Sequence, residues 1–115
     1  MTGPDLFAGL FARDYGSSRS WYERLLGREP SFLPSDTEAV WELGEHRWLY
    51  LKQHGDHAGH GEVTIFPEDL DATVAGAAER GLAPDRQEDY PGGVRKVVFR
   101  DPDGNEIGFG GGAAG

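Results

Sequence analysis

The sequence predicts an α+β fold built from two similar units, each with a strand, a helix and further strands. Two helical patterns end alike, one in the segment Leu25-Leu26-Gly27-Arg28-Glu29-Pro30 and the other in Glu79-Arg80-Gly81-Leu82-Ala83-Pro84. The glycines of the two segments are 54 positions apart, and so are the prolines. An apolar run precedes each helix and strand-like runs follow it. We therefore expect two copies of one unit packed around a shared cleft.

Composition limits the class of protein. The 115 residues suffice for one domain with a core. The net charge of −9 disfavours nucleic acid and anionic membranes as partners, because both select basic surfaces. The absence of cysteine excludes disulfides and thiolate metal sites. Without a signal peptide or a run of about 20 apolar residues, we expect a cytoplasmic protein. Nine arginines against two lysines, with much alanine and glycine, fit a GC-rich bacterial genome.

The first unit is predicted to span a strand at 6–12 that is buried on both faces, followed by a helix and three further strands. Ser17 and Ser18 are suitable N-cap residues, and Trp21, Tyr22, Leu25 and Leu26 follow at helical spacing. Gly27 is the expected end of the helix. The later strands are predicted at 31–33, 38–43 and 47–53.

The turn between the last two of these strands sets the register of a hairpin. Gly44-Glu45 suits a two-residue loop with glycine first. This register places Trp41 directly opposite Trp48, with Tyr50 on the same face. A cross-strand aromatic pair is also a common stabiliser of sheets, so the two tryptophans belong either to a ligand site or to the core.

The second unit repeats the pattern after a polar linker at 54–61. A strand is predicted at 62–66, and acidic residues then open a helix whose first turn favours them. A strand at 94–100 leads into Asp101-Pro102-Asp103-Gly104-Asn105, a turn sequence. A last strand follows at 106–109.

These segments resemble the vicinal-oxygen-chelate superfamily, which contains glyoxalases, bleomycin-resistance proteins and extradiol dioxygenases. Residues 20–27 (SWYERLLG) are similar to its "FYxxxLG" helix, and residues 68–71 (EDLD) are similar to its "D(L/V)D" helix start. Residues 99–107 (FRDPDGNEI) resemble its closing "DPDGNxIE". The resemblance covers residues 6–109.

The resemblance implies two βαβββ modules whose strands form a curled mixed sheet around a cleft. We expect one domain over 1–115, with a first module at about 5–53, a linker at 54–61 and a second module at about 62–109. It also implies a homodimer, and it leaves open whether the modules pair within one chain or between two.

In metal-dependent members of this family, four strand positions supply the ligands of a divalent ion. These positions fall on Phe7, Tyr50, Glu62 and Gly108. Only Glu62 is a good donor, and one carboxylate does not hold a catalytic metal. The resemblance is therefore closest to the metal-free, bleomycin-resistance-like branch, and we expect neither a metal, nor another cofactor, nor catalytic residues.

Aromatic side chains are expected to replace the metal in the cleft. Alternation places Phe7 and Phe11 on one face of the first strand, and Trp48 and Tyr50 on the same face of the fourth. An aromatic wall with a few polar groups is typical of a site for a flat ligand. The predicted function is metal-independent binding and sequestration of a small molecule, such as an antibiotic or an aromatic natural product, and the acidic chain favours a cationic group on it. The predicted ligand-binding residues are Phe7, Phe11, Trp41, Trp48, Tyr50, Glu62, Thr64, Phe66, Lys96 and Val98.

Other interpretations remain open. The chain could be a lyase, isomerase or dioxygenase-like enzyme, with Glu62 as a general base or with a metal held by Glu62 and a loop histidine. It could instead be a structural domain with a collapsed cleft, and Glu62 with Lys96 could form an ion pair. His54, His57 and His60 have a three-residue spacing that aligns side chains on a helix. The glycines among them argue against a helix, so we expect a solvated loop.

Overall fold

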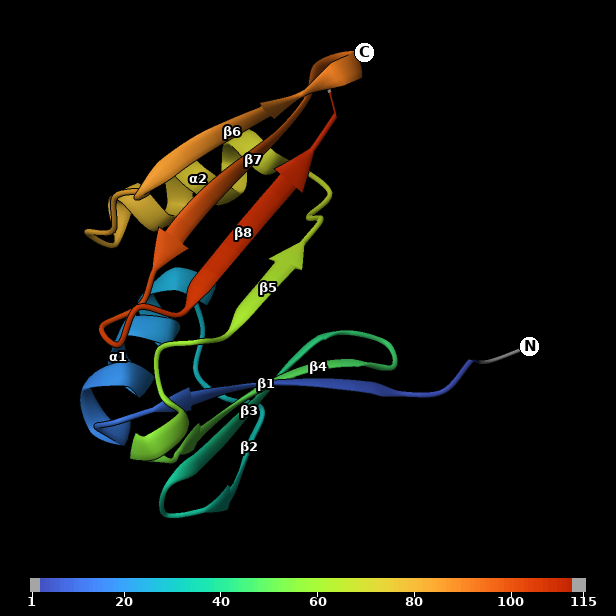
Figure 1. Cartoon of the computed structure of the whole chain (residues 1–115). Helices are drawn as coiled ribbons and strands as arrows, with labels where there is room; N and C mark the ends of the chain where they lie inside the picture. Colours follow the sequence, from blue (N-terminus) through green and yellow to red (C-terminus); the bar gives the residue numbers. More distant parts are fainter. Residues whose placement is uncertain (1–2, 113–115) are drawn as a thin grey trace.

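The computed structural model describes residues 3–112 and confirms an α+β architecture of two similar units (Figure 1). Each unit is a four-stranded mixed sheet with one helix against it. The strand orders are β1-β4-β3-β2 and β5-β8-β7-β6, so β1 and β5 are edge strands. Residues 1–2 and 113–115, the ends of the predicted domain, lie outside the described residues. No helix within residues 3–112 is long and apolar enough to cross a membrane.

Most predicted elements are found close to their expected bounds. The first unit consists of β1 (Leu6–Ala12), α1 (Tyr15–Leu26), β2 (Phe32–Ser35), β3 (Glu38–Gly44) and β4 (Arg47–Gln53), followed by the 3₁₀ turn η1 (Gly55–His57). The second consists of β5 (Glu62–Ile65), α2 (Leu70–Glu79), β6 (Arg86–Tyr90), the 3₁₀ turn η2 (Pro91–Gly93), β7 (Val94–Arg100) and β8 (Glu106–Gly111). β6, a polar strand at the sheet edge, is not among the predicted elements.

The helix ends follow from local chemistry. Gly27 after α1 and Gly81 after α2 adopt φ of 74° and 88°, a left-handed conformation that suits glycine, and both predicted stops are confirmed. The predicted N-cap of α1 is wrong, because the helix begins at Tyr15 with Asp14 as its N-cap. Ser18 is instead buried inside the helix, where its hydroxyl donates to Asp103.

The predicted register of the β3–β4 hairpin is also wrong. Gly44 pairs with Arg47, so the loop is Glu45-His46, and the register shifts between Glu42 and Gly44. Trp41 consequently lies opposite Leu49 rather than Trp48, and a shift of one residue moves a side chain to the other face of the sheet. The Trp41 ring is fully buried in the core, where its indole N–H donates to the Arg28 carbonyl at 3.1 Å. It therefore does not line an open cleft.

The core lies between each sheet and its helix. Tyr22 and Leu25 of α1 pack against Leu10 and Leu49 of the first sheet, and all four are almost fully buried. Both sheets and both helices contribute to a single apolar cluster, which in the second unit includes Leu70, Ala77, Val97, Phe99, Ile107 and Phe109. The expectation that β1 is buried on both faces is not met, because its first residues, Leu6 and Phe7, are exposed.

A buried polar cluster joins the two units through the predicted turn at residues 101–105. Asp101 is 5% exposed, and its carboxylate accepts hydrogen bonds from the Tyr22 hydroxyl at 2.7 Å and the Asn105 amide at 2.8 Å. The side chain of Asn105 also donates to the Phe11 carbonyl at 2.9 Å and accepts from the Gly61 N–H at 2.7 Å. We call these residues the Asp101 cluster. Burial, followed by the neighbouring carboxylate, raises the pKa of Tyr22.

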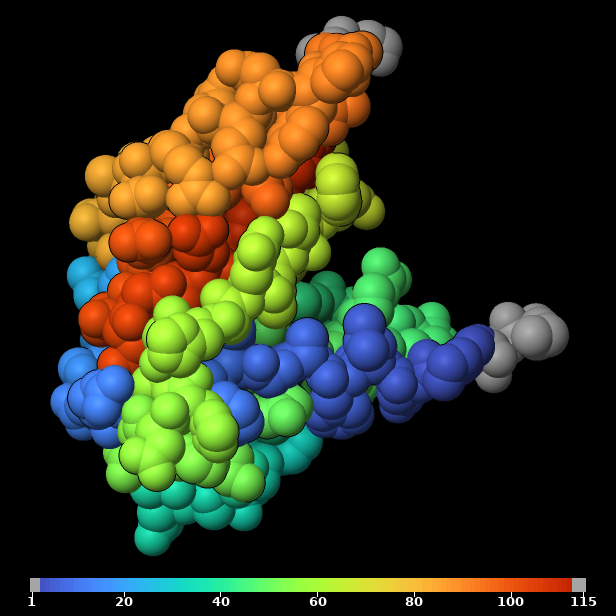
Figure 2. Space-filling view, in the orientation of Figure 1, coloured from blue at the N-terminus to red at the C-terminus, as the bar shows by residue number. Residues whose placement is uncertain are grey.

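The Asp101 cluster fixes one end of the interface between the units. The opposite ends of the two sheets diverge, and Figure 2 shows the resulting notch between the second unit and the strands of the first. In Figure 1, β1 crosses below the second sheet, and its first residues lie away from the second unit.

We predict that Asp101→Asn lowers the free energy of unfolding by about 2–3 kcal/mol, because an amide cannot accept all the hydrogen bonds that end on this buried carboxylate. Urea unfolding monitored by circular dichroism measures the change, and a single transition is expected because the units share one core. Asp36→Asn, at an exposed turn, is the matched control. A loss no larger than that of the control would contradict the role of the cluster.

Candidate functional site

Each sheet has one face against a helix and one open face, and the predicted binding residues lie mainly on the open faces. In the first unit β1 runs parallel to β4, with Phe7 beside Trp48 and Gly9 beside Tyr50. The prediction that the aromatic residues of these two strands share a face is confirmed by this register. The rings of Phe7 and Trp48 are stacked, with centroids 5.3 Å apart and planes 7° from parallel. We call this pair, with the neighbouring Tyr50 and Phe11, the aromatic wall.

The aromatic wall continues onto residues that the sequence analysis missed. Phe32 of β2 meets Trp48 edge to face, at a centroid distance of 6.0 Å. A hollow of about 350 Å³ lies beside it, lined by Phe7, Phe32, Pro34, Glu38, Val40, Tyr50 and Lys52. The alternation of Phe32 with Pro34, and of Tyr50 with Lys52, was the available signal. The predicted strand at 31–33 is too short to include Pro34, so this alternation does not appear in the prediction.

Gly9 lets the aromatic wall close over β1. The ring of Tyr50 lies directly over Gly9, where a Cβ atom would overlap the phenol. The absence of a side chain at this position therefore allows Tyr50 to lie flat against the neighbouring strand. The indole N–H of Trp48 is buried and has no hydrogen-bond acceptor among residues 3–112. Buried donors are rarely left without an acceptor.

The open face of the second sheet is charged rather than aromatic. The Lys96 ammonium lies 3.5 Å from a Glu62 oxygen and 3.6 Å from a Glu88 oxygen. The predicted proximity of Glu62 and Lys96 is thus found as an ion pair. Partial desolvation lowers the pKa of Lys96, but Tyr90, Glu88 and Glu62 outweigh it and leave the pKa above its ordinary value.

Arg86 forms hydrogen bonds with acidic residues of this face. Its guanidinium donates to both oxygens of Glu106, at 2.8 and 3.1 Å, and to Glu88 at 2.8 Å. Arg100 also donates to Glu106, at 3.3 Å. These residues, with Lys96 and Glu62, form what we call the charged wall. The hydrogen bonds from Arg86, opposed by partial desolvation and aided by Arg100, lower the pKa of Glu106 to about 2.

The residues expected to surround one cleft are divided between the two sheets. Only first-unit residues line the 350 Å³ hollow, and Glu62, Lys96 and Val98 line neither it nor the larger cavity between the units. Within the described chain, the aromatic residues of the first sheet lie together, and so do Glu62 and Lys96 of the second. The two groups do not meet in one cleft. Phe66, at the end of β5, is 70% exposed, and its ring lies over Gly110.

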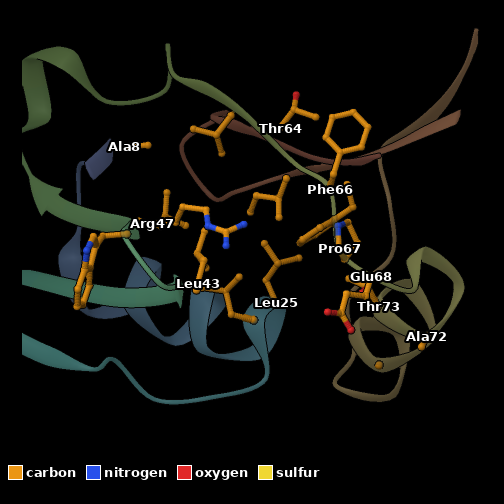
Figure 3. Close-up of a pocket in the computed structure, with 18 of the residues that line it drawn as sticks. Ala8, Leu25, Leu43, Arg47, Thr64, Phe66, Pro67, Glu68, Ala72 and Thr73 are labelled. Carbon is orange, nitrogen blue, oxygen red and sulfur yellow. The ribbon is translucent and has the colours of Figure 1, made fainter. Parts of the chain in front are cut away.

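The larger cavity, of about 750 Å³, lies between the two units, and residues of both helices and of the edge strands β1 and β5 line it (Figure 3). Leu25, Leu43 and Arg47 approach it from the first unit, and Phe66 and Glu68 approach it from the second (Figure 3). Among the predicted site residues, Trp48, Thr64 and Phe66 line this cavity. Its remaining lining is mainly apolar.

The positions that hold a metal in some members of the resembled family do not fit one here. Phe7 and Gly108 offer no side-chain donor, and the one carboxylate, Glu62, already contacts the Lys96 ammonium. The Lys96 stem covers Gly108, where a Cβ would lie 2.8 Å from the lysine Cδ. A general-base role for Glu62 would require an enclosed carboxylate, but its side chain is 63% exposed.

The topology, two βαβββ units with open sheet faces, defines a class of cleft-forming proteins. Residues 5–109 match the family described as Glyoxalase/Bleomycin resistance protein/Dioxygenase superfamily, and the chain belongs to this family. It is 52% identical to a glyoxalase/bleomycin resistance protein from Catenulispora acidiphila, with a TM-score of 0.91 over 94% of this chain and 97% of that one. No curated protein matches the sequence.

More distant structures share the fold. A bleomycin-binding protein in complex with bleomycin has a TM-score of 0.73 at 21% identity, over 94% of this chain and 98% of that one. Lactoylglutathione lyase from Agrobacterium tumefaciens has a TM-score of 0.74 at 20% identity, over 96% and 94%. The same fold therefore occurs in a binding protein and in an enzyme. The function of this chain has to be inferred from the residues of its own site.

The charged wall generates a pH-dependent prediction. Because the folded pKa of Glu106 lies below its ordinary value of 4.5, its network stabilises the fold above that pH and loses this contribution as the pH falls toward 2. Arg86→Met should therefore raise the pKa of Glu106, measured by carboxyl ¹³C NMR titration. Arg47→Met, which removes an arginine outside this network, should leave it unchanged. An unaltered Glu106 pKa in Arg86→Met would contradict the assignment.

Proposed function

We propose that this protein binds and sequesters a small molecule that carries a flat aromatic ring. The observation that supports this most directly is the aromatic wall, in which Phe7, stacked on Trp48, and Tyr50 line a hollow on an open sheet face. Stacking on such a wall contributes about 0.5–1.5 kcal/mol per ring pair beyond burial.

The charged wall favours a ligand with a cationic or hydrogen-bonding group. The carboxylate of Glu62 is well exposed, with the Lys96 ammonium as its only ion-pair partner among residues 3–112. Its remaining lone pairs can therefore accept hydrogen bonds from a ligand. The net charge of −9 adds a long-range attraction for cations. Carboxylate and ammonium together suit a group that both donates and accepts.

We further propose that two copies of the chain complete each cleft. The outer edges of β1 and β5 are unpaired within the described chain, and exposed edges of this kind tend to pair with another strand. Pairing β1 of one copy with β5 of its partner would place the aromatic wall beside the charged wall. Apolar side chains beside these edges are exposed, namely Leu6, Phe7 and Phe66.

Trp48→Ala is expected to weaken ligand binding about three- to tenfold, the loss of one stacking contact. Isothermal titration calorimetry with bleomycin, and with a panel of flat aromatic cations, measures the change. The affinity of Trp48→Phe, which keeps a smaller ring, should fall between those of Trp48→Ala and the unmodified protein. In the unmodified protein, ligand quenching of tryptophan fluorescence should report mainly on Trp48, because Trp21 and Trp41 are buried.

Leu33→Ala provides the matched control for the aromatic wall. Leu33 is an exposed apolar residue between Phe32 and Pro34, but it does not line the hollow. Its loss should leave affinity unchanged. Equal affinity of Trp48→Ala and the unmodified protein, for a ligand that does bind, would remove the aromatic wall from the site.

The dimer is tested separately with Leu6→Asp and Phe66→Asp, each of which places a charge beside an edge strand. Both should convert a dimer into monomers, as measured by size-exclusion chromatography with light scattering, and both should also reduce ligand affinity because half of the cleft is lost. Tyr90→Asp, at an exposed aromatic residue at the end of β6, should remain dimeric. A monomeric unmodified protein would contradict the shared cleft.

A further inference from the structure

Two histidine rings lie together at the junction between the units. His54 directly follows β4, and His57 ends the 3₁₀ turn η1. Their ring centroids are 4.4 Å apart, with planes inclined by 52°. This places both imidazoles in contact on one side of the chain, in a segment expected to be an irregular solvated loop.

The 3₁₀ turn explains why the rings meet. In a 3₁₀ helix residues three apart are eclipsed, so side chains at i and i+3 lie on the same side. The His57 N–H donates to the His54 carbonyl at 3.1 Å, the hydrogen bond that defines such a turn. The glycines of the linker disfavour an α-helix, but one 3₁₀ turn with Gly55 inside it is sufficient.

The pair is held in place by the end of the first sheet. The His54 N–H donates to the Ala12 carbonyl at 2.9 Å, which ties the turn to the last residue of β1. Phe11 packs beneath the rings, with centroid distances of 5.3 Å to His54 and 5.9 Å to His57. The histidine pair therefore continues the aromatic wall, and packing against Phe11 limits the positions that each imidazole can adopt.

We propose that His54 and His57 form a two-imidazole binding site for a divalent transition metal ion. Both side chains are exposed, and neither has a hydrogen-bond or ion-pair partner among residues 3–112. Neutral imidazole nitrogen is a preferred ligand of Zn²⁺, Ni²⁺ and Cu²⁺. A chelate with metal–nitrogen bonds of about 2.0–2.1 Å needs its two donor atoms roughly 3 Å apart, which rings already in contact can reach by small rotations.

The protein supplies two ligands to this site, and water or an atom of a bound molecule supplies the others. No group of three histidine, aspartate or glutamate side chains within residues 3–112 is placed to hold an ion. Affinity should therefore be modest and the coordination sphere open. Of the nearby charges, Arg13 approaches Gly55 and lies 3.9 Å from an oxygen of Asp103, and Asp56 lies between the two histidines in the sequence. The site is separate from the positions of Phe7, Tyr50, Glu62 and Gly108.

Titration with Ni²⁺ or Zn²⁺ tests the proposal on untagged protein at about pH 7.5, where imidazole is largely neutral. Isothermal titration calorimetry should give one ion per chain. His54→Ala and His57→Ala should each weaken binding about tenfold or more, because each removes half of the protein ligands. His60→Ala is the matched control, since this exposed histidine lies on the same loop outside the pair. Binding should also weaken toward about pH 5.5, where protons compete with the metal.

NMR identifies the ligands independently of affinity. On addition of Zn²⁺ the ring C–H signals of His54 and His57 should shift together, while those of His46 and His60 should not. Circular dichroism of the alanine variants checks that they fold. Absence of binding, binding that survives in the His54→Ala/His57→Ala double variant, or an equal loss in His60→Ala would each overturn the proposal. Ligand binding by the aromatic wall is measured without metal and can fail or succeed separately.

Discussion

The buried carboxylate of Asp101 is the constraint on which the relative placement of the two units depends. Its oxygens accept from the Tyr22 hydroxyl, the Asn105 side chain and the N–H groups of Asp103 and Asn105. A buried charge is tolerated only when its hydrogen bonds are satisfied. Because one of these donors lies on α1 and the others lie in the β7–β8 turn, satisfying the charge requires both units to be in place.

A second contact between the units lies at the C-terminal end of α1. The Arg80 guanidinium, just after α2, donates to the carbonyls of Arg24 and Leu25. Unpaired carbonyls at a helix C-terminus carry partial negative charge, so this cation both satisfies and stabilises the end of α1. Gly27 and Gly76 allow the close approach, since a Cβ at either would crowd the guanidinium. Both contacts hold the helix sides of the units together and leave the open sheet faces free.

The sequence was sufficient for the features that depend on local chemistry. The apolar runs located β1, β4 and β7, and the glycine stops located the helix ends, because burial and left-handed backbone geometry restrict the residues allowed there. Features decided by tertiary contacts were not predictable in the same way. Two-residue loops favour glycine at the first position, which predicts Gly44-Glu45 as the turn. The observed turn is instead Glu45-His46, with His46 at φ of 65°, and this turn sets the register of Trp41. The polar strand β6 has no apolar periodicity, since it is an edge strand.

The candidate site was predicted only in its parts. Alternation along β1 and β4 correctly placed Phe7, Trp48 and Tyr50 on one face, because the side-chain period of a strand is fixed. Their separation from Glu62 and Lys96 depends on how the Asp101 cluster orients the two sheets, and no local pattern encodes that angle. The contact between His54 and His57 depends on a single 3₁₀ turn, which is too short to leave a periodic signal.

Comparison of the two sheets indicates where the chain is free to carry function. At helix-facing positions both units are apolar, with Leu10 beside Leu51 in the first and Val63 beside Ile107 in the second. At open-face positions they differ in chemistry, since Phe7 beside Trp48 corresponds to Glu62 beside Glu106. The core fixes the first set, because replacing an apolar residue there by a charge would cost several kcal/mol. The second set has no such constraint from the fold, so its aromatic and ionic pairs are the residues to which a binding function can be assigned.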